Sequence, residues 1–226
     1  MVHQACAQGR FGEQALITCY VPWWRDDAYY APPRWQGSAA LDGGGALMNQ
    51  SIHGVDLVQW FAQAAFGHAQ PVQEVFCYSA RLAHDAALME VEDSAVLSLR
   101  FVGGGLGQIL ATTASFPGSL RRFHLGGRGG SVELLEEQLL SWQFAQGIEA
   151  DAGMLQRFGA DTGHAGAVRD PFAMDFVNHQ RNLEAFLAAL EDERPPELDG
   201  REARKAVAIT LAAYQSARLG QPVRLS

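Results

Sequence analysis

Lysine is almost missing from this sequence, and its positive charge comes nearly all from arginine. Among 226 residues Lys205 is the only lysine, and 17 basic residues stand against 25 acidic ones, which gives a formal net charge of −8 at pH 7. This acidic balance argues against nucleic acids and anionic membranes as partners. No apolar run approaches the roughly 20 residues of a membrane-spanning helix, and the N-terminal segment MVHQACAQGRFG has no signal-peptide core. We therefore expect a cytoplasmic protein.

Cysteine is scarce as well. Cys6, Cys19 and Cys77 lie far apart and form no CxxC pair. This pattern argues against a disulfide framework and against a cysteine-built zinc site. We interpret the three residues as plain thiols packed in the core, in a reducing compartment.

A recognisable set of metal ligands is also missing. Possible ligand pairs are His53 with Asp56 and His84 with Asp85, and the acidic run at residues 90–93 adds carboxylates. No third ligand has a recognisable spacing, so we predict no metal site. We interpret the acidic run as solvent-exposed residues that precede a strand.

The sequence contains no phosphate-binding fingerprint. Glycine clusters occur at residues 43–45, 103–105 and 126–130, but none forms GxGxxG between a strand and a helix. The last two lie between predicted strands and are interpreted as turns. The first precedes a predicted helix, where backbone N–H groups can meet a ligand oxygen, unless the glycines only allow close packing of the backbone. There is also no GxSxG, so nucleophilic catalysis has little support.

The residues that are present form an ordinary globular mixture, with 48% apolar and 19% charged residues. The chain starts with the end of a helix, and residues 13–22 are a predicted strand. Beyond Pro71, β-rich runs between glycine-rich turns predict an antiparallel meander of VQEVFCYSARL, DSAVLSLRFV, GQILATTASF, RRFHLGG and GSVELLE. Residues 145–172 are predicted to be a long flexible loop. Two amphipathic helices follow, the second capped by Asp199.

Together these segments predict a single domain over residues 1–226, of the α+β class. The expected architecture is an open, mostly antiparallel or mixed β-sheet with helices on one face.

Candidate functional residues gather in the first third of the chain. Residues 23–42 are rich in tryptophan and tyrosine, and Pro32–Pro33 argues against regular structure there. The glycines at 43–45 then open a predicted helix of about twenty residues, with one polar stripe formed by Asn49, His53, Asp56 and Trp60. The imidazole of His53 can exchange protons near neutral pH. On spacing alone, a structural His–Asp pair explains this stripe as well as a catalytic one does.

One segment resembles a family signature. LDGGGALMNQSIHGVDLVQWF is similar to the pattern GG-x-L-x-D-x-G-x-H-x-x-D of the glucose–fructose oxidoreductase / inositol dehydrogenase / MocA (Gfo/Idh/MocA) family, with matches at Gly44, Gly45, Leu47, His53 and Asp56. The resemblance continues through VPWWRDDAYY, EVEDSAVLSLRF and GQILATTASFPG, and into the ending FLAALEDERPPELDGREARKAVAITLAAYQSARLGQPVRL. It therefore covers nearly the whole chain, with several separated motifs in order.

The resemblance implies a two-domain architecture for the complete enzyme. In this family an N-terminal Rossmann domain binds NAD or NADP, and a C-terminal domain supplies the substrate site and the oligomer interface. This chain resembles only the C-terminal part, because GxGxxG and the Glu-Lys-Pro segment, whose lysine assists catalysis in the family, are both missing. Lys205 lies in a region that matches a different part of the family. We therefore expect the N-terminal Rossmann domain to be absent from this chain, and no cofactor to bind the chain alone.

The resemblance also assigns candidate roles. His53 would be the acid/base residue for a carbinol proton, Asp56 would orient it or the helix, and Asn49 would hold substrate. Asn49 stands where many family members carry Asp, and an amide cannot accept a proton as a general base. The substrate side would be lined by a set that suits a sugar or polyol ring, namely Arg25, Tyr29, Tyr30, Trp35, Gly44 and Gly45.

Three functional hypotheses follow. The leading one is a substrate-binding domain of an NAD(P)-dependent oxidoreductase that acts on a sugar or polyol and is inactive alone. The second is a standalone, non-catalytic module that binds a sugar-like ligand or serves oligomerisation or regulation. The third is one half of a split dehydrogenase whose Rossmann domain is a separate chain. The resemblance also implies a homo-oligomer, because the open sheet face in this family commonly packs against another copy, and apolar surface left uncovered by a missing domain adds to this tendency.

Overall fold

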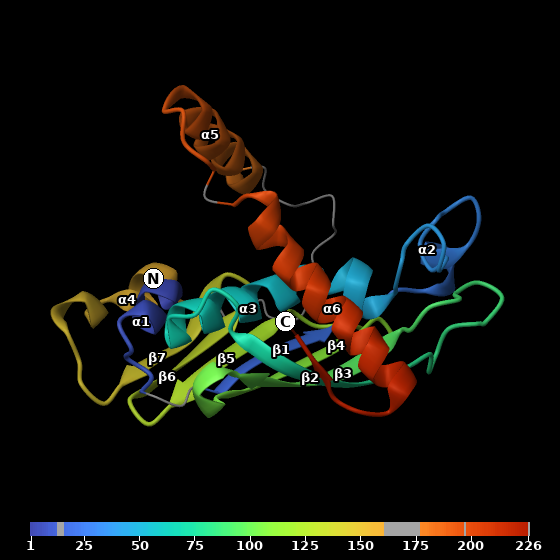
Figure 1. Cartoon of the computed structure of the whole chain (residues 1–226), viewed down its shortest axis with the longest axis horizontal. Helices are drawn as coiled ribbons and strands as arrows, with labels where there is room; N and C mark the ends of the chain where they lie inside the picture. The colour runs from blue at the N-terminus through green and yellow to red at the C-terminus, as the bar shows by residue number, and fades with distance from the viewer. Residues whose placement is uncertain (13–15, 161–176, 197, 226) are drawn as a thin grey trace.

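The structure, a computed structural model, describes residues 1–12, 16–160, 177–196 and 198–225. Among these residues, eight strands form one sheet in the order β7-β6-β5-β1-β4-β3-β2-β8 (Figure 1). The strands are β1 (Leu16–Pro22), β2 (Val72–Ala80), β3 (Ser94–Phe101), β4 (Leu106–Thr112), β5 (Arg122–Gly127), β6 (Gly130–Leu135), β7 (Gln138–Phe144) and β8 (Val223–Arg224). The α+β class with an open mixed sheet is thus confirmed.

The sheet consists of two antiparallel meanders joined along one parallel pair. β2, β3 and β4 form one meander, and β5, β6 and β7 form the other. β1 lies between them, antiparallel to β5 and parallel to β4, with Leu16 opposite Leu106 and Pro22 opposite Thr112. The local strand patterns predicted β2 to β6 as one continuous meander. The sheet interrupts it, because β1 lies between β4 and β5, and β7 was not predicted. The parallel pairing of β1 with β4 joins segments that are far apart in sequence.

Helices α1, α3 and α6 lie on one face of this sheet, α5 projects away from it, and no helix among the described residues covers the other face (Figure 1). They are α1 (Val2–Ala7), α2 (Asp27–Tyr30), α3 (Ile52–Phe66), α4 (Met154–Phe158), α5 (Val177–Glu191) and α6 (Gly200–Leu219), with a π-helix at Ala46–Gln50 and 3₁₀ turns at Val102–Gly104 and Glu149–Asp151. As predicted, the Asp199 side chain caps α6 by accepting from the Arg201 and Glu202 amides. Within the described residues, no helix is both long and apolar enough to cross a bilayer.

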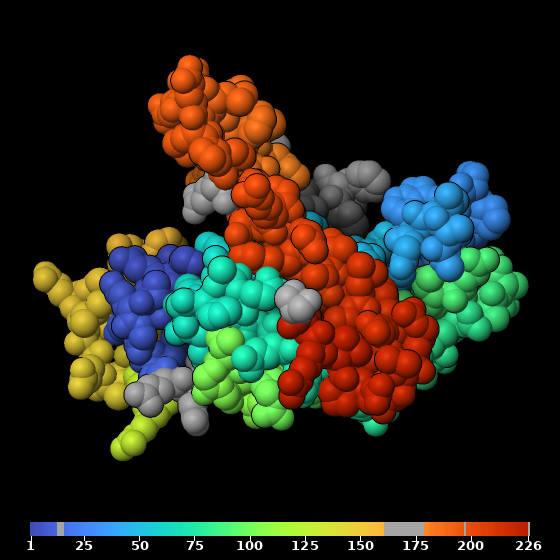
Figure 2. Space-filling model, viewed as in Figure 1, coloured from blue at the N-terminus to red at the C-terminus, as the bar shows by residue number. Residues whose placement is uncertain are grey.

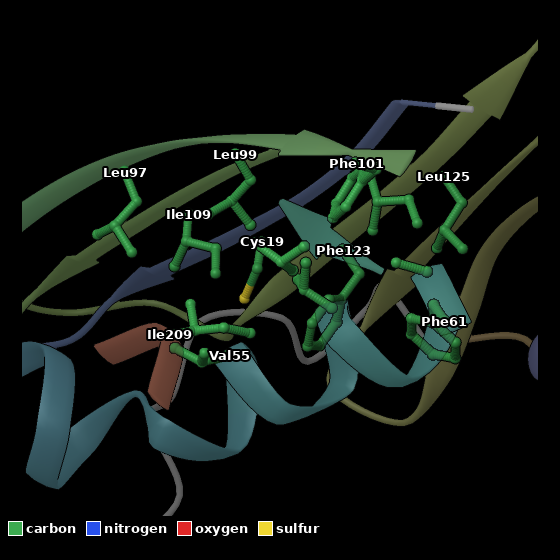
Figure 3. Close-up of a cluster of buried hydrophobic side chains, with 14 of the residues drawn as sticks. Cys19, Val55, Phe61, Leu97, Leu99, Phe101, Ile109, Phe123, Leu125 and Ile209 are labelled. Carbon is green, nitrogen blue, oxygen red and sulfur yellow. The ribbon is translucent and has the colours of Figure 1, made fainter. Parts of the chain in front are cut away.

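The core lies between the sheet and helices α3 and α6 (Figure 3). Val55 and Phe61 of α3 and Ile209 of α6 point toward inward-facing residues of β1, β3, β4 and β5, including Cys19, Leu97, Ile109 and Phe123. Gly54 allows α3 to approach β1 closely, because a Cβ there would lie 2.9 Å from Cys19 Sγ. All three cysteines are buried free thiols, as predicted.

Two local predictions were wrong. The predicted helix after Gly45 is broken: a π-helix ends at Gln50, Ser51 takes a non-helical conformation (φ −114°, ψ 3°), and α3 starts at Ile52. Part of the predicted loop at 145–172 is ordered, because α4 lies there and packs on β7 through the buried Met154. Residues 161–172 of that loop lie outside the described residues.

The irregular segment after β1 holds one short regular element. α2 is a single turn whose first amides are capped by Asp26, which accepts from Tyr29 N at 3.1 Å. The apolar stripe of α5 has helical spacing, as predicted, but its residues are exposed: Leu183, Phe186, Leu187 and Leu190. Helix α5 projects from the rest of the molecule in Figure 2, so these side chains lack a covering surface within the described chain.

Candidate functional site

The π-helix that carries Asn49 is held in place by Glu92. The Glu92 carboxylate accepts from the amides of Gly45 (3.0 Å) and Leu47 (2.9 Å) and from the Tyr214 hydroxyl (2.9 Å). Burial raises the pKa of Glu92, while the hydrogen bonds from Leu47 and Tyr214 act against this increase. A Cβ at Gly45 would lie 1.8 Å from the Glu92 carbonyl oxygen. The glycines therefore allow close backbone packing, and the Gly45 amide is already engaged within the protein.

Four polar side chains form a continuous hydrogen-bonded chain at the end of this π-helix. Asn49 Nδ2 donates to Asp42 Oδ1 at 2.6 Å, and Gln50 Nε2 donates both to Asn49 Oδ1 and to the Tyr29 hydroxyl, the latter at 3.0 Å. Asp42 also accepts from the Gly37 amide at 2.9 Å. Because a carboxylate only accepts, Asp42 determines which end of the Asn49 amide faces it. π-helical segments often occur at functional sites.

His53 and Asp56 lie on α3, beyond the break at Ser51. His53 is exposed and lies on the first turn. Asp56 is half-buried, and its Oδ1 accepts from Gln59 Nε2 at 3.5 Å. Burial raises the pKa of Asp56, whereas the Gln59 bond and the charge of His53 act to lower it. In the described structure Asp56 bonds to Gln59, and no hydrogen bond between Asp56 and His53 is found.

Lys205, the one lysine, is engaged in packing. Its Nζ donates to Gln63 of α3 at 2.9 Å and to both Glu202 carboxylate oxygens at 2.7 and 2.6 Å. It therefore fastens α6 to α3.

Residues 23–42, which are rich in tryptophan and tyrosine and are called the aromatic segment below, are held in place by a buried histidine–aspartate pair. His84 Nδ1 lies 3.0 Å from Asp93 Oδ2, and His84 Nε2 lies 2.8 Å from the Arg25 carbonyl oxygen. Trp24 stacks on the His84 ring and Tyr30 meets it edge-on. The Tyr30 hydroxyl donates to Thr113 at 3.0 Å. Tyr30 is therefore buried beneath the segment rather than on its surface.

Asp93 is fully buried and accepts from several donors at once. These are the amides of Leu82, Ala83 and His84, the His84 ring and the Ser94 hydroxyl, at 2.9 to 3.2 Å. Burial acts to raise the pKa of Asp93, but the hydrogen bonds from Ala83, Leu82 and His84 outweigh it, and the pKa lies below its ordinary value. Figure 1 shows the α2 segment beside the β2–β3 loop that this carboxylate organises.

Arg25 and Tyr29 of this segment are half-buried, and Trp35 is exposed. The Arg25 guanidinium lies 5.3 Å from the ring centres of both Trp23 and Tyr29. Trp35 is 49% exposed. Arg25, Tyr29, Gln50 and Asn49 are therefore joined by contacts, while His53 lies on the following helix.

Several contributors to this site escaped the sequence patterns. The acidic run at 90–93 was predicted to be solvent-exposed, which is wrong for Asp93. The alternating burial of β3 offers the missed signal: Ala95, Leu97 and Leu99 face inward, and one more step back along this period reaches Asp93. Asp42, Gln50 and His84 have no comparable signal, because only the fold brings them to their partners. Among the described residues, no group of three or more His, Cys, Asp or Glu side chains is arranged to hold a metal.

Comparison with known proteins assigns the chain to a family. The family profile described as the GFO/IDH/MocA C-terminal domain matches residues 1–133. The chain belongs to the Gfo/Idh/MocA family. No curated protein sequence matches it.

Solved structures of the family share the whole fold. The WlbA dehydrogenase from Bordetella pertussis, in complex with NADH and UDP-GlcNAcA, is 30% identical with a TM-score of 0.79, and the match covers 100% of this chain and 60% of that one. WlbA from Chromobacterium violaceum, also in complex with NADH and UDP-GlcNAcA, is 29% identical with a TM-score of 0.80, covering 100% and 58%. Levoglucosan dehydrogenase, in complex with NADH and levoglucosan, shares the fold at 16% identity and a TM-score of 0.74, covering 100% and 62%. This Gfo/Idh/MocA chain thus spans about 60% of the length of the solved relatives that it matches.

Proposed function

We propose that this chain is the substrate-binding part of a cytoplasmic NAD(P)-dependent oxidoreductase that acts on a sugar or polyol. One observation carries the proposal: the chain Asp42–Asn49–Gln50–Tyr29 places hydroxyl-binding groups beside an aromatic surface, and an exposed imidazole follows on α3. Polar groups of this kind beside aromatic rings suit a ring with several hydroxyls. The complexes of the two WlbA relatives with NADH and a sugar nucleotide support the same assignment.

The cofactor is assigned to a unit outside these residues. The sequence has no GxGxxG, and the first amides of the π-helix are taken by Glu92. The residues present therefore do not form a dinucleotide cradle. The exposed apolar stripe on α5 supports a neighbouring unit, because contiguous exposed apolar surface marks interaction sites. We propose that NAD or NADP binds a Rossmann domain at this side, on the same or on a separate chain.

In this proposal the chain's own residues bind the sugar and move one proton. Tyr29 and Gln50 bind ring hydroxyls with the donor and acceptor groups that their own hydrogen bond does not use. His53 accepts the hydroxyl proton of the carbon that is oxidised, since an imidazole is well matched to proton transfer at neutral pH. Asp56 stabilises the resulting imidazolium through its charge. The Asp42 carboxylate orients Asn49, which cannot itself act as a base.

Binding and turnover test this proposal separately. We expect the purified chain to bind UDP-GlcNAcA, the ligand of the two WlbA relatives, in calorimetry, to leave NADH unbound, and to show no turnover alone. Joined to the dinucleotide domain of the 30% identical relative, it should oxidise the sugar that it binds. His53→Gln should abolish that turnover while sugar binding is retained. His68→Gln is the matched control, because His68 is exposed and its described hydrogen bonds are with Gln70. NADH binding and turnover by the chain alone would contradict the proposal.

A second function remains in view because of Asn49. Both ends of its amide are engaged, by Asp42 and by Gln50. A site that carries an engaged amide at position 49 instead of a carboxylate also suits a non-catalytic sugar-binding module. Sugar binding without turnover in the joined protein would favour that module.

We also propose that the chain forms a homo-oligomer through the bare face of the sheet. One apolar row crosses four strands on that face, because the register places Tyr78 opposite Val96, Val96 opposite Leu110, and Leu110 opposite Tyr20. Tyr78, Val96 and Tyr20 are 69%, 38% and 42% exposed. A second copy would bury this row.

A further inference from the structure

Within the described part of the chain, the Arg25 guanidinium in the candidate site has no counter-charge. Its backbone is fixed on both sides, because its N–H donates to the Thr113 carbonyl at 2.9 Å and its own carbonyl lies 2.8 Å from His84 Nε2. Its Nη1 donates to the Trp24 carbonyl at 3.0 Å. Its Nε is buried and has no hydrogen-bond partner among the described residues, which is also true of Arg121 Nε, so the missing ion pair is what sets Arg25 apart. Among the described residues, no carboxylate forms an ion pair with it.

Two other arginines show what a completed site of this type looks like. Arg10 lies over the Phe144 ring and forms two hydrogen bonds of 2.7 Å with the Asp151 carboxylate. Arg121 lies over the Phe123 ring and pairs with Glu136 at 3.0 Å. Their side chains are 10% and 13% exposed. In both, an aromatic ring covers the guanidinium plane and a carboxylate binds its edge.

Arg25 has the first part of this arrangement and lacks the second. Trp23 and Tyr29 lie against its guanidinium. Asp26, the nearest acidic residue along the chain, is directed to the amides of α2, where it accepts from Tyr29 N. A guanidinium taken partly out of water without a counter-ion is costly, and an anion from a ligand would remove that cost.

We propose that Arg25 binds a carboxylate or phosphate group of the ligand, so that the site takes an acidic sugar rather than a neutral one. This inference rests on the proposed sugar site. Arg25 is connected to that site through Tyr29, whose ring it contacts and whose hydroxyl accepts from Gln50. A planar guanidinium recognises both kinds of anion through paired N–H donors. His84 and Asp93 are positioning residues, because they hold the Arg25 backbone and make no contact with the guanidinium.

A matched series of ligands tests the charge alone. D-glucose, D-glucuronate and glucose 6-phosphate share a ring and differ at C6. We would titrate the whole 226-residue chain with each ligand, by calorimetry and by following the Arg25 Nε–H resonance in ¹⁵N spectra. We expect an acidic ligand to bind about tenfold more tightly than glucose, the factor typical of one charge-assisted contact. The preference should weaken as salt is added.

The variants identify the residue responsible. Arg25→Gln should remove the preference, so that the acidic ligands and glucose bind alike. Arg25→Lys, which keeps the charge but loses the planar fork, should keep a reduced preference and covers the case in which Arg25→Gln does not fold. Arg157→Gln should behave as the unchanged chain, because Arg157 lies over the Phe158 ring on the distant helix α4.

The outcomes separate this inference from the function on which it rests. If tight binding of glucuronate requires Arg25, the group that Arg25 binds is a sugar carboxylate. If tight binding of glucose 6-phosphate requires Arg25, the group is a phosphate. Equal binding of all three ligands, or a preference that survives Arg25→Gln, would refute the inference and leave the sugar site standing. Binding of none of the three would contradict the proposed sugar site as well.

Discussion

Replacing Asp93 by asparagine should break the hydrogen bonds that hold the aromatic segment in place and should lower the stability of the fold. The Asp93 side chain is fully buried and accepts only from N–H and O–H donors, three of them backbone amides. An asparagine would turn an NH₂ group toward those donors and would leave His84 without its carboxylate. Breaking a buried charged pair in this way costs about 3–5 kcal/mol. Total stabilities are about 5–15 kcal/mol, so the loss is a large fraction of the whole.

Urea unfolding measures this loss directly. With a slope of about 3 kcal/mol per molar, Asp93→Asn should lower the unfolding midpoint by about 1–1.7 M. Asp85→Asn is the control from the same loop, because Asp85 is exposed and accepts from the Ala87 amide. It should change stability by less than about 0.5 kcal/mol. An Asp93→Asn midpoint equal to that of the unchanged chain would refute the reasoning.

The pH dependence provides a second check on the same residue. The folded-state pKa of Asp93 is lower than its ordinary value. Its stabilising contribution is therefore complete above about pH 4, the unfolded value, and is lost as the pH falls through the lower folded value. The unchanged chain should lose stability over this acid range, and Asp93→Asn should lose less. A variant as acid-sensitive as the unchanged chain would show that Asp93 carries no such linkage.

Three further predictions concern the core, the site and the sheet face. Burial raises the pKa of Cys6, Cys19 and Cys77 to about 12. A disulfide reagent at pH 8 should therefore label none of these thiols in the folded chain and all three in urea. Fast labelling of the folded chain would count against their burial. Gly45→Ala should cost on the order of 3 kcal/mol, because its Cβ would overlap the Glu92 carbonyl; Gly200→Ala, with no atom within 4 Å of the added carbon, should be harmless, and equal urea midpoints for the two would disprove the overlap. Val96→Arg should convert a homo-oligomer to a monomer in sedimentation, whereas Leu211→Arg, on the exposed side of α6, should not; a monomeric unchanged chain would contradict the proposed interface.

Local patterns predicted most of the secondary structure because they report local properties. A period of two in β3 and helical spacing in α3 follow directly from which side chains face the core. The Asp199 cap needs only its own next two amides. The helix break at Ser51 escaped prediction, since the residues around it are compatible with a helix. The π-helix that precedes this break has its first amides bound by Glu92 and Tyr214, which come from distant segments of the chain.

The residues of the candidate site were also predictable only in part, for the same reason. The motif around His53 and Asp56 was recognisable from the sequence because its residues follow one another on a single element. The link from Asn49 to Asp42 and Gln50 required the π-helix geometry. The link from His84 to Arg25 joins residues 59 positions apart, and no periodicity reports such a pairing.

Residue type and spacing were enough to predict the class of fold, most strand and helix segments, the family resemblance and the absence of a dinucleotide fingerprint. These are properties of neighbouring positions. The folded chain was needed to show that β1 lies parallel to β4, that Asp93 is a buried acceptor, and that Arg25 has no counter-charge among the described residues. Each of these is a relation between distant segments, set by which hydrogen-bonding and charged groups the packed core brings together and which it leaves unpaired.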